Sequence, residues 1–188
     1  MSANEYYIVT EWRVKGTVNE VADILSQATE LPRWWPSVYL DVQELEPGDE
    51  QGIGKMVRLY TKGWLPYTLR WTFRVTESSY PYGFALEAWG DLVGRGIWTL
   101  RQDGEWARII YDWKINAEKP LLRTFSFLFK PIFTANHGWA MRMGEESLKL
   151  ELLRRRARSP EERARIPTPP GPTFKNSIQR KQSITSRL

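Results

Sequence analysis

Residues 65–117 read LPYTLRWTFRVTESSYPYGFALEAWGDLVGRGIWTLRQDGEWARIIYDWKINA, and this aromatic-rich stretch decides the fold. Apolar and polar residues alternate in two segments of it, which is the pattern of a strand with one buried and one exposed face. The inward residues are Leu69, Trp71, Phe73 and Val75 in the first segment and Ile109, Tyr111, Trp113 and Ile115 in the second. A sheet with so many inward rings is built either to pack tightly or to enclose a cavity.

Turn-forming residues divide the chain into further strands. Asp103-Gly104 is a two-residue hairpin turn, and proline or glycine lies in the neighbouring links. We predict strands at residues 6–14, 38–46, 55–62, 66–77, 82–90, 94–102 and 105–117. The links between the later strands are too short for crossover helices, so the sheet is predicted to be antiparallel.

Two short helices are predicted between the first and second strands. Thr17 and Glu20 have capping-box spacing, so a helix is expected to begin near Val18, and a helical turn follows around residues 31–35. Together with the strands and a long helix near the C-terminus, these elements give an α+β fold class. The expected architecture is a seven-stranded antiparallel sheet wrapped around the long C-terminal helix.

The long C-terminal helix is expected to follow a short helix near residues 121–129. Pro131 suits the first turn of the long helix, which runs to about Ala157. Helical spacing places one set of residues on the face that meets the sheet. This set is Phe133, His137, Ala140, Met141, Gly144, Leu148 and Leu152. Gly144 weakens a helix by about 1 kcal/mol relative to alanine, so it implies a close approach to the sheet or a gap there.

His137 is the one histidine of the chain, and two interpretations of it remain open. It is either a buried side chain held by a hydrogen bond or a group that contacts ligand or takes part in catalysis. We do not expect a metal site, because a lone histidine without cysteine would need carboxylates from distant strands. No cofactor is predicted.

Glycines and tryptophans give further indications of a cavity. Gly94 and Gly96 interrupt a strand and indicate either a bulge or room beneath the helix. Trp98 is in phase with them, and a large ring beside absent side chains indicates an apolar recess, although close backbone packing would give the same pattern. Trp34 and Trp35 are adjacent on a short turn, so we expect one to cap the core and the other to face an opening.

Composition excludes several classes of protein. A chain of 188 residues is most simply one domain with appendages. The absence of cysteine excludes disulfides, thiolate nucleophiles and cysteine-type zinc sites. The N-terminus has neither the basic nor the apolar region of a secretory signal, and no uncharged apolar run reaches the roughly 20 residues of a membrane span. We therefore expect a cytoplasmic protein.

The net charge of +5 is concentrated near the C-terminus. Residues 154–188 contain ten basic and two acidic residues, whereas residues 1–153 contain 17 basic and 20 acidic ones. Prolines recur between 160 and 172 and are expected to exclude regular structure there. We therefore divide the chain into a domain at 1–158 and a disordered basic tail at 159–188. The tail is expected to contact anionic surfaces weakly, and no specific nucleic-acid binding is expected.

Three segments resemble the START-like (SRPBCC) superfamily, in particular its polyketide cyclase/dehydrase and lipid-transport branch. ELPRWWPSVYLDVQELEPGDEQGIGK, from residue 30, is similar to the region between the small helices and the third strand. GDLVGRGIWTLRQDGEWARIIYDWKI, from residue 90, is similar to the block of strands five to seven. Asn136-His137-x-x-x-Met141 is similar to the helix motif of this branch, and it is followed by Gly144, Glu145 and Leu148. The resemblance covers about residues 5–155.

The resemblance implies a helix-grip fold with a hydrophobic cavity between the sheet and the long helix. Members of the superfamily bind lipids, sterols, polyketides or plant hormones, and some catalyse cyclisation or dehydration. We hypothesise a binding protein for a hydrophobic or aromatic small molecule, lipid-like or polyketide-like. The alternative is a cyclase/dehydrase-type enzyme with His137 as general acid/base. The expected ligand-binding residues are Trp35, Trp71, Phe73, Trp98, Tyr111, Trp113, His137 and Met141. The oligomeric state is not predicted.

Overall fold

The computed structural model describes residues 5–117 and 126–173. These residues form a seven-stranded antiparallel sheet in the order β1-β7-β6-β5-β4-β3-β2. The strands are β1 (Glu5–Lys15), β2 (Tyr39–Glu46), β3 (Met56–Lys62), β4 (Thr68–Ser78), β5 (Gly83–Gly90), β6 (Leu92–Asp103) and β7 (Trp106–Ala117). Each lies within two residues of its expected bounds, and the predicted α+β fold class is confirmed.

The described helices lie before β2 and after β7. They are α1 (Val18–Ser26), the 3-10 helix η1 (Ala28–Glu30), α2 (Leu31–Trp34), α4 (Ser126–Arg156) and α5 (Pro160–Ala164). The predicted capping box is present at α1. The Thr17 hydroxyl accepts a hydrogen bond from the Glu20 backbone N–H at 3.2 Å, and the Glu20 carboxylate accepts one from the Thr17 N–H at 2.8 Å.

The long helix begins earlier than predicted. α4 runs from Ser126 through Pro131 to Arg156, so the expected break before Pro131 is absent. Proline fixes φ near the helical value and removes one backbone donor, so a helix with many other hydrogen bonds can continue through it. The end of α4 is within one residue of the predicted end, and residues 121–125 of the expected short helix lie outside the described residues.

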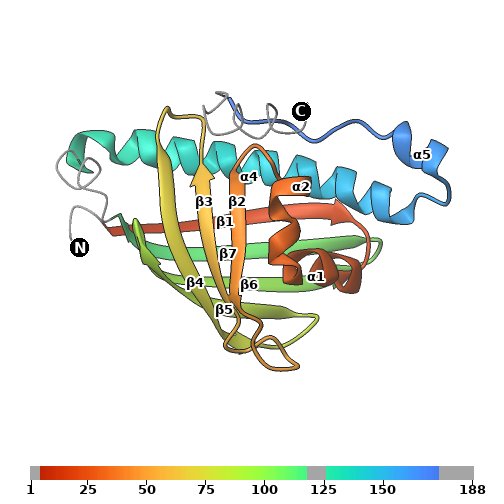
Figure 1. Ribbon diagram of the computed structural model, residues 1–188, viewed down its shortest axis with the longest axis horizontal. Coiled ribbons are helices and arrows are strands. Elements are labelled where there is room, and N and C mark those ends of the chain that lie inside the picture. The colour runs from red at the N-terminus through yellow and green to blue at the C-terminus, as the bar shows by residue number, and fades with distance from the viewer. Residues whose placement is uncertain (1–4, 118–125, 174–188) are drawn as a thin grey trace, which may run out of the picture.

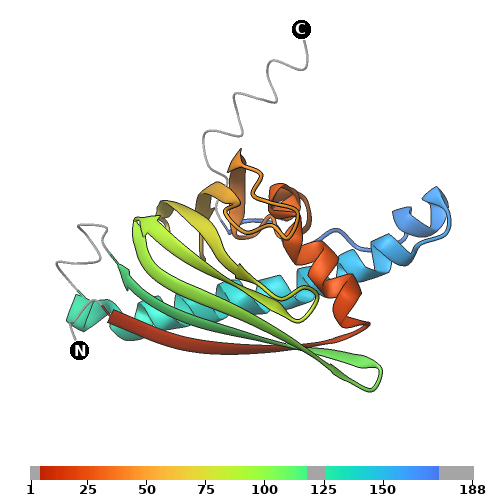
Figure 2. The ribbon, with the colours of Figure 1, turned by 90° about the horizontal axis from the view of Figure 1, so that it is seen from below.

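The curvature of the sheet creates the space around α4 (Figures 1 and 2). β1, β7 and β6 run nearly along α4, whereas β2, β3 and β4 cross it steeply. The concave face of the sheet therefore faces the helix. Trp98 and Trp113 point inward and are buried as predicted, while Trp71 is only partly buried. None of the helices in the described parts of the chain combines the length and the apolarity that crossing a membrane requires.

The segment after α4 is more regular than predicted. Pro160 begins α5, where its missing N–H leaves no helical hydrogen bond unmade, and the Ser159 hydroxyl caps the helix by accepting from the Glu162 N–H. The prediction that prolines exclude regular structure here is therefore wrong at α5. Further along, the Thr173 hydroxyl donates to the Trp64 carbonyl at 3.4 Å. Residues 174–188 of the expected tail lie outside the described residues.

Deletion of residues 159–188 is expected to change the melting temperature by less than about 2 °C. α5 has no buried residue, and exposed groups make the hydrogen bonds from this segment to the domain. Calorimetry on the full and truncated chains would measure the shift, and binding to anionic vesicles should weaken in the truncated chain. A decrease of about 5 °C or more would place the segment inside the domain and contradict the boundary at 158.

Candidate functional site

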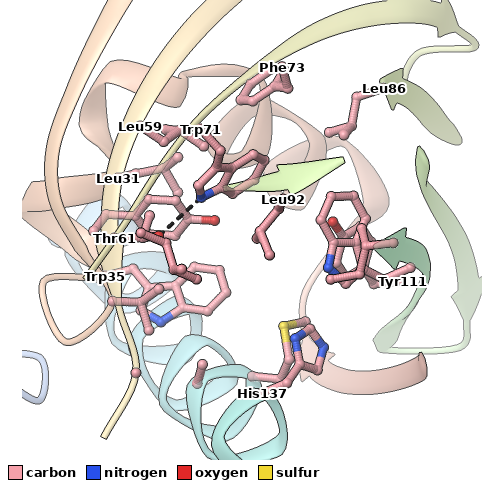
Figure 3. A pocket seen from close by; sticks show the side chains of 18 of the residues that line it. Leu31, Trp35, Leu59, Thr61, Trp71, Phe73, Leu86, Leu92, Tyr111 and His137 are labelled. Carbon is pink, nitrogen blue, oxygen red and sulfur yellow. Dashed lines mark hydrogen bonds between the residues drawn. The ribbon is translucent and has the colours of Figure 1, made fainter. Parts of the chain in front are cut away.

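A cavity of about 140 Å³ lies between the concave face of the sheet and α4. Its lining is mostly apolar and comes from the sheet, from α4 and from the segment around α2 (Figure 3). All eight residues that were expected to bind a ligand line it, namely Trp35, Trp71, Phe73, Trp98, Tyr111, Trp113, His137 and Met141. The tertiary structure thus brings the whole set together, and contact with a ligand stays a prediction.

Aromatic rings from β4, β5, β6 and β7 form a continuous surface along one side of the cavity, which we call the aromatic wall. Its members are Phe73, Trp71, Trp113, Tyr111, Trp98 and Phe84. The ring centroids of Trp98 and Tyr111 are 4.1 Å apart and those of Tyr111 and Trp113 are 5.4 Å apart, both pairs being stacked. Packing of this kind holds the rings in fixed orientations, so the wall is preorganised.

Gly96 of β6 leaves space for two rings of the aromatic wall, because it has no side chain. The pairing of β6 with β7 is continuous at this point, with Gly96 opposite Trp113, so the bulge interpretation of Gly94 and Gly96 is wrong. A Cβ atom on Gly96 would lie 2.8 Å from the Trp113 ring and 2.9 Å from the Tyr111 hydroxyl. The missing side chain therefore provides the room in which these two rings stack.

The adjacent tryptophans at the end of α2 are both buried, with 0% exposure for Trp34 and 3% for Trp35. α2 contacts both β2 and α4, which buries both rings. Trp34 lies in the core as expected for one of the pair, and the other ring faces the internal cavity instead of an opening to solvent. Trp35 lines the cavity, and its ring lies against Gly144, where a Cβ atom would collide with it. This contact explains a glycine in the middle of a long helix.

His137 lies on the cavity wall contributed by α4, across from Trp71 and near Tyr111 (Figure 3). Its Nε2 atom is buried, and no residue in the described part of the chain forms a hydrogen bond with it. Burial lowers the pKa of His137 to about 4 because the imidazolium would lose its hydration. The imidazole is therefore neutral at pH 7.

The cavity also contains phenol groups that stay protonated. Burial raises the pKa of Tyr39, and it raises that of Tyr111 well above the usual value, with a smaller contribution from the nearby Tyr39 hydroxyl. Both hydroxyls can therefore donate hydrogen bonds over the whole physiological pH range. Tyr39 was not predicted as a site residue, although it stands at the start of a predicted strand and next to the tryptophan pair.

Three other polar residues of the lining were missed by the sequence analysis. Thr61 continues the inward phase of β3 and its hydroxyl accepts from Trp71 Nε1 at 3.0 Å. Asn136 precedes His137 in the quoted motif, and its Oδ1 accepts from the Leu65 N–H at 3.2 Å. Lys62 is buried although it is out of phase with Thr61, and burial lowers its pKa. Only the first two had a sequence signal.

Comparisons with known proteins identify the fold. No family model matches the sequence, and no curated protein matches it. The Zhui aromatase/cyclase from Streptomyces sp. R1128 is 16% identical, with a TM-score of 0.63 over 82% of this chain and 97% of that one. A norcoclaurine synthase from Thalictrum flavum is 14% identical, with a TM-score of 0.59 over 81% and 97% of the two chains.

A third similar structure is the STAR-related lipid transfer protein from Xanthomonas axonopodis. It is 15% identical, with a TM-score of 0.51 over 78% of this chain and 85% of that one. At such identities the likeness establishes the fold and not the activity. The chain therefore has the helix-grip fold that was predicted from its sequence.

Proposed function

We propose that this helix-grip chain binds a hydrophobic or aromatic small molecule in the cavity between the sheet and α4. The observation that carries the proposal is an apolar, aromatic-walled cavity whose lining contains two buried polar atoms, His137 Nε2 and Trp35 Nε1, without a hydrogen-bond partner among the described residues. Leaving such an atom unpaired costs about 1–3 kcal/mol, which a ligand with a complementary group would recover. The names of the similar structures, which include a lipid transfer protein and an aromatase/cyclase, support a small-molecule role.

The volume of the cavity limits what fits without rearrangement. An engineered protein cavity of about 150 Å³ binds benzene, so a cavity of about 140 Å³ accepts about one aromatic ring. The stacked aromatic wall offers a flat surface to that ring, and the neutral imidazole and phenols offer hydrogen bonds to a hydroxyl or carbonyl on it. A ring with one uncharged polar substituent is therefore the minimal ligand.

The alternative is a cyclase/dehydrase-type reaction in which His137 transfers a proton. Two of the similar structures are named as enzymes, which favours this alternative. A general acid/base works best when its pKa is near the working pH, whereas burial brings that of His137 to about 4. No carboxylate is among the described residues of the lining to orient or recharge it. We therefore favour binding without chemistry.

The test compares phenol with toluene, which have similar size but differ in hydrogen bonding. Wild type should bind phenol more tightly, and His137→Ala should remove most of that preference, about a fivefold loss for phenol. His137→Gln should keep it, since an amide also forms hydrogen bonds. Thr134→Ala, at an exposed position of the same helix, is the matched control. Isothermal titration calorimetry would give the affinities.

The dependence on pH gives an independent check. Phenol affinity should be constant from pH 8 to pH 5, because the imidazole stays neutral until the pH approaches about 4. If neither ring compound binds to wild type, the proposal is wrong. If polyketide-like substrates are turned over by wild type and not by His137→Gln, the enzyme alternative replaces it.

A further inference from the structure

A second, larger chamber adjoins the aromatic cavity, and we call it the outer chamber. Its volume is about 900 Å³, and it lies between the end of α1, η1, the β2–β3 loop at 47–55 and the β4–β5 hairpin. Leu25, Ala28, Phe73 and Phe84 line both spaces, so these four side chains lie between the two chambers. We call these four residues the neck.

The walls of the outer chamber are tied to one another. Lys55 Nζ from the β2–β3 loop donates to the Ser26 carbonyl at the end of α1, at 3.3 Å. The Tyr80 hydroxyl from the β4–β5 hairpin donates to Asp23 of α1 at 2.8 Å. Asp49 accepts hydrogen bonds at 3.0 and 2.8 Å from two backbone N–H groups of its own loop. The first two contacts join separate elements around the chamber, and the Asp49 hydrogen bonds order the β2–β3 loop.

The two chambers differ in chemistry. The cavity behind the neck is lined mainly by aromatic and aliphatic side chains, whereas the outer chamber is rich in hydroxyl and amide groups. These groups belong to Ser26, Gln27, Thr29, Gln51, Ser78 and Ser79. The charged residues of its lining are Glu44, Asp49, Glu50 and Lys55. Lys55 lies 3.7 Å from Glu44, so negative charge is in excess and an anionic group would be repelled.

We propose that the two chambers form one site for an elongated amphipathic ligand with an uncharged, hydroxyl-bearing end. Its ring lies against the aromatic wall, an aliphatic chain passes the neck, and the polar end reaches the outer chamber. This inference rests on the proposed function and extends it from a single ring to a ligand class. The sizes support it, because about 140 Å³ holds one ring while the adjoining 900 Å³ leaves room for the rest.

The test uses ω-phenylalkanols, from benzyl alcohol to 6-phenylhexanol, and the carboxylates of the same lengths. Each buried methylene is expected to tighten alcohol binding about three- to fourfold. The carboxylates should bind several-fold more weakly than the alcohols, because their charged end meets Glu44, Asp49 and Glu50. Isothermal titration calorimetry on the full chain at constant ionic strength would measure both series.

Two variants assign the effects to the outer chamber. Glu50→Lys should reduce the preference for alcohols over carboxylates, whereas the same charge change in Glu146→Lys, on the exposed side of α4, should not. Ser78 lines the outer chamber and not the aromatic cavity, so Ser78→Phe should weaken the binding of 6-phenylhexanol while phenol binding persists. If that variant does not fold, the length series in wild type still decides.

Each outcome separates this inference from the proposed function. Phenol binding together with an affinity that does not rise with chain length would overturn the two-chamber site and leave the cavity as a ring-binding site. Tighter binding of the carboxylates would overturn the assignment of an uncharged end. Failure of phenol itself to bind would instead count against the proposed function.

Discussion

Replacing Trp113 with alanine is expected to lower the free energy of unfolding by about 3–5 kcal/mol. The side chain is 3% exposed and lies in the middle of the aromatic wall. Its ring is stacked on that of Tyr111, and its centroid is 5.8 Å from that of the Trp71 ring, to which it is tilted. Beneath it is Gly96, which has no side chain to fill the space that the indole would leave. The loss therefore combines the transfer of the ring to water with an enlarged cavity. Denaturant unfolding monitored by circular dichroism would measure it.

Trp89 provides the matched control for this experiment. It lies on β5, and its side chain is 41% exposed on the outer face of the sheet. Trp89→Ala should change the free energy of unfolding by less than about 0.5 kcal/mol. A Trp113→Ala variant that is as stable as Trp89→Ala would contradict the buried position of Trp113. Addition of indole should restore part of the stability of Trp113→Ala, because a ligand that binds only the folded state stabilises it.

Replacing Arg33 with alanine is expected to cost about 2 kcal/mol, because it removes a partner from a buried carboxylate although the Arg33 side chain is itself half exposed. Glu151 of α4 is 1% exposed, and its two oxygens accept from the Arg33 guanidinium at 2.7 and 2.8 Å. Arg155 supplies a third hydrogen bond at 2.9 Å and remains in the variant, so the loss should be smaller than for a fully buried pair. The pair also fixes α2, and with it Trp35, against α4.

An arginine–glutamate pair with two hydrogen bonds on the protein surface is the control. Arg108 donates two hydrogen bonds to Glu11 at 2.6 and 2.8 Å, but both side chains are about half exposed. Arg108→Ala should cost no more than about 1 kcal/mol, since solvent screens the pair. The double variant Arg33→Met/Glu151→Leu removes both charges of the pair. Most of the stability that is lost in Arg33→Ala should therefore be restored in it. Equal losses in Arg33→Ala and Arg108→Ala would contradict the role of burial.

Acid should reduce the effect of the Arg33 replacement. Burial raises the pKa of Glu151, but hydrogen bonds from Arg33 and Arg155 outweigh that effect, and the net pKa lies below its usual 4.5. A carboxyl whose pKa is lowered by folding stabilises the protein above its unfolded pKa, and the contribution disappears as the pH falls through the folded pKa. The difference in unfolding free energy between wild type and Arg33→Ala should therefore shrink below about pH 4.5. Unfolding curves from pH 3 to pH 7 would measure it.

The candidate site was predictable wherever a residue follows a regular period. The inward phases of β4, β6 and β7 placed Trp71, Trp98 and Trp113 correctly, and the helical period placed His137 on the face toward the sheet. Tyr39 and Lys62 were not predictable in this way. Both stand at an end of a strand, where the alternation of inward and outward side chains no longer holds.

The sequence by itself determined the number of strands, their antiparallel pairing, the capped first helix and the inward face of the long helix. These features depend on local periodicity and turn chemistry, which a few neighbouring residues specify. Only the tertiary structure decided that Gly96 makes room for Trp113, that Trp34 and Trp35 are both buried, and that an outer chamber adjoins the cavity. These features depend on how the curved sheet brings together segments that are far apart in the sequence. A local sequence pattern does not specify which distant segments come into contact.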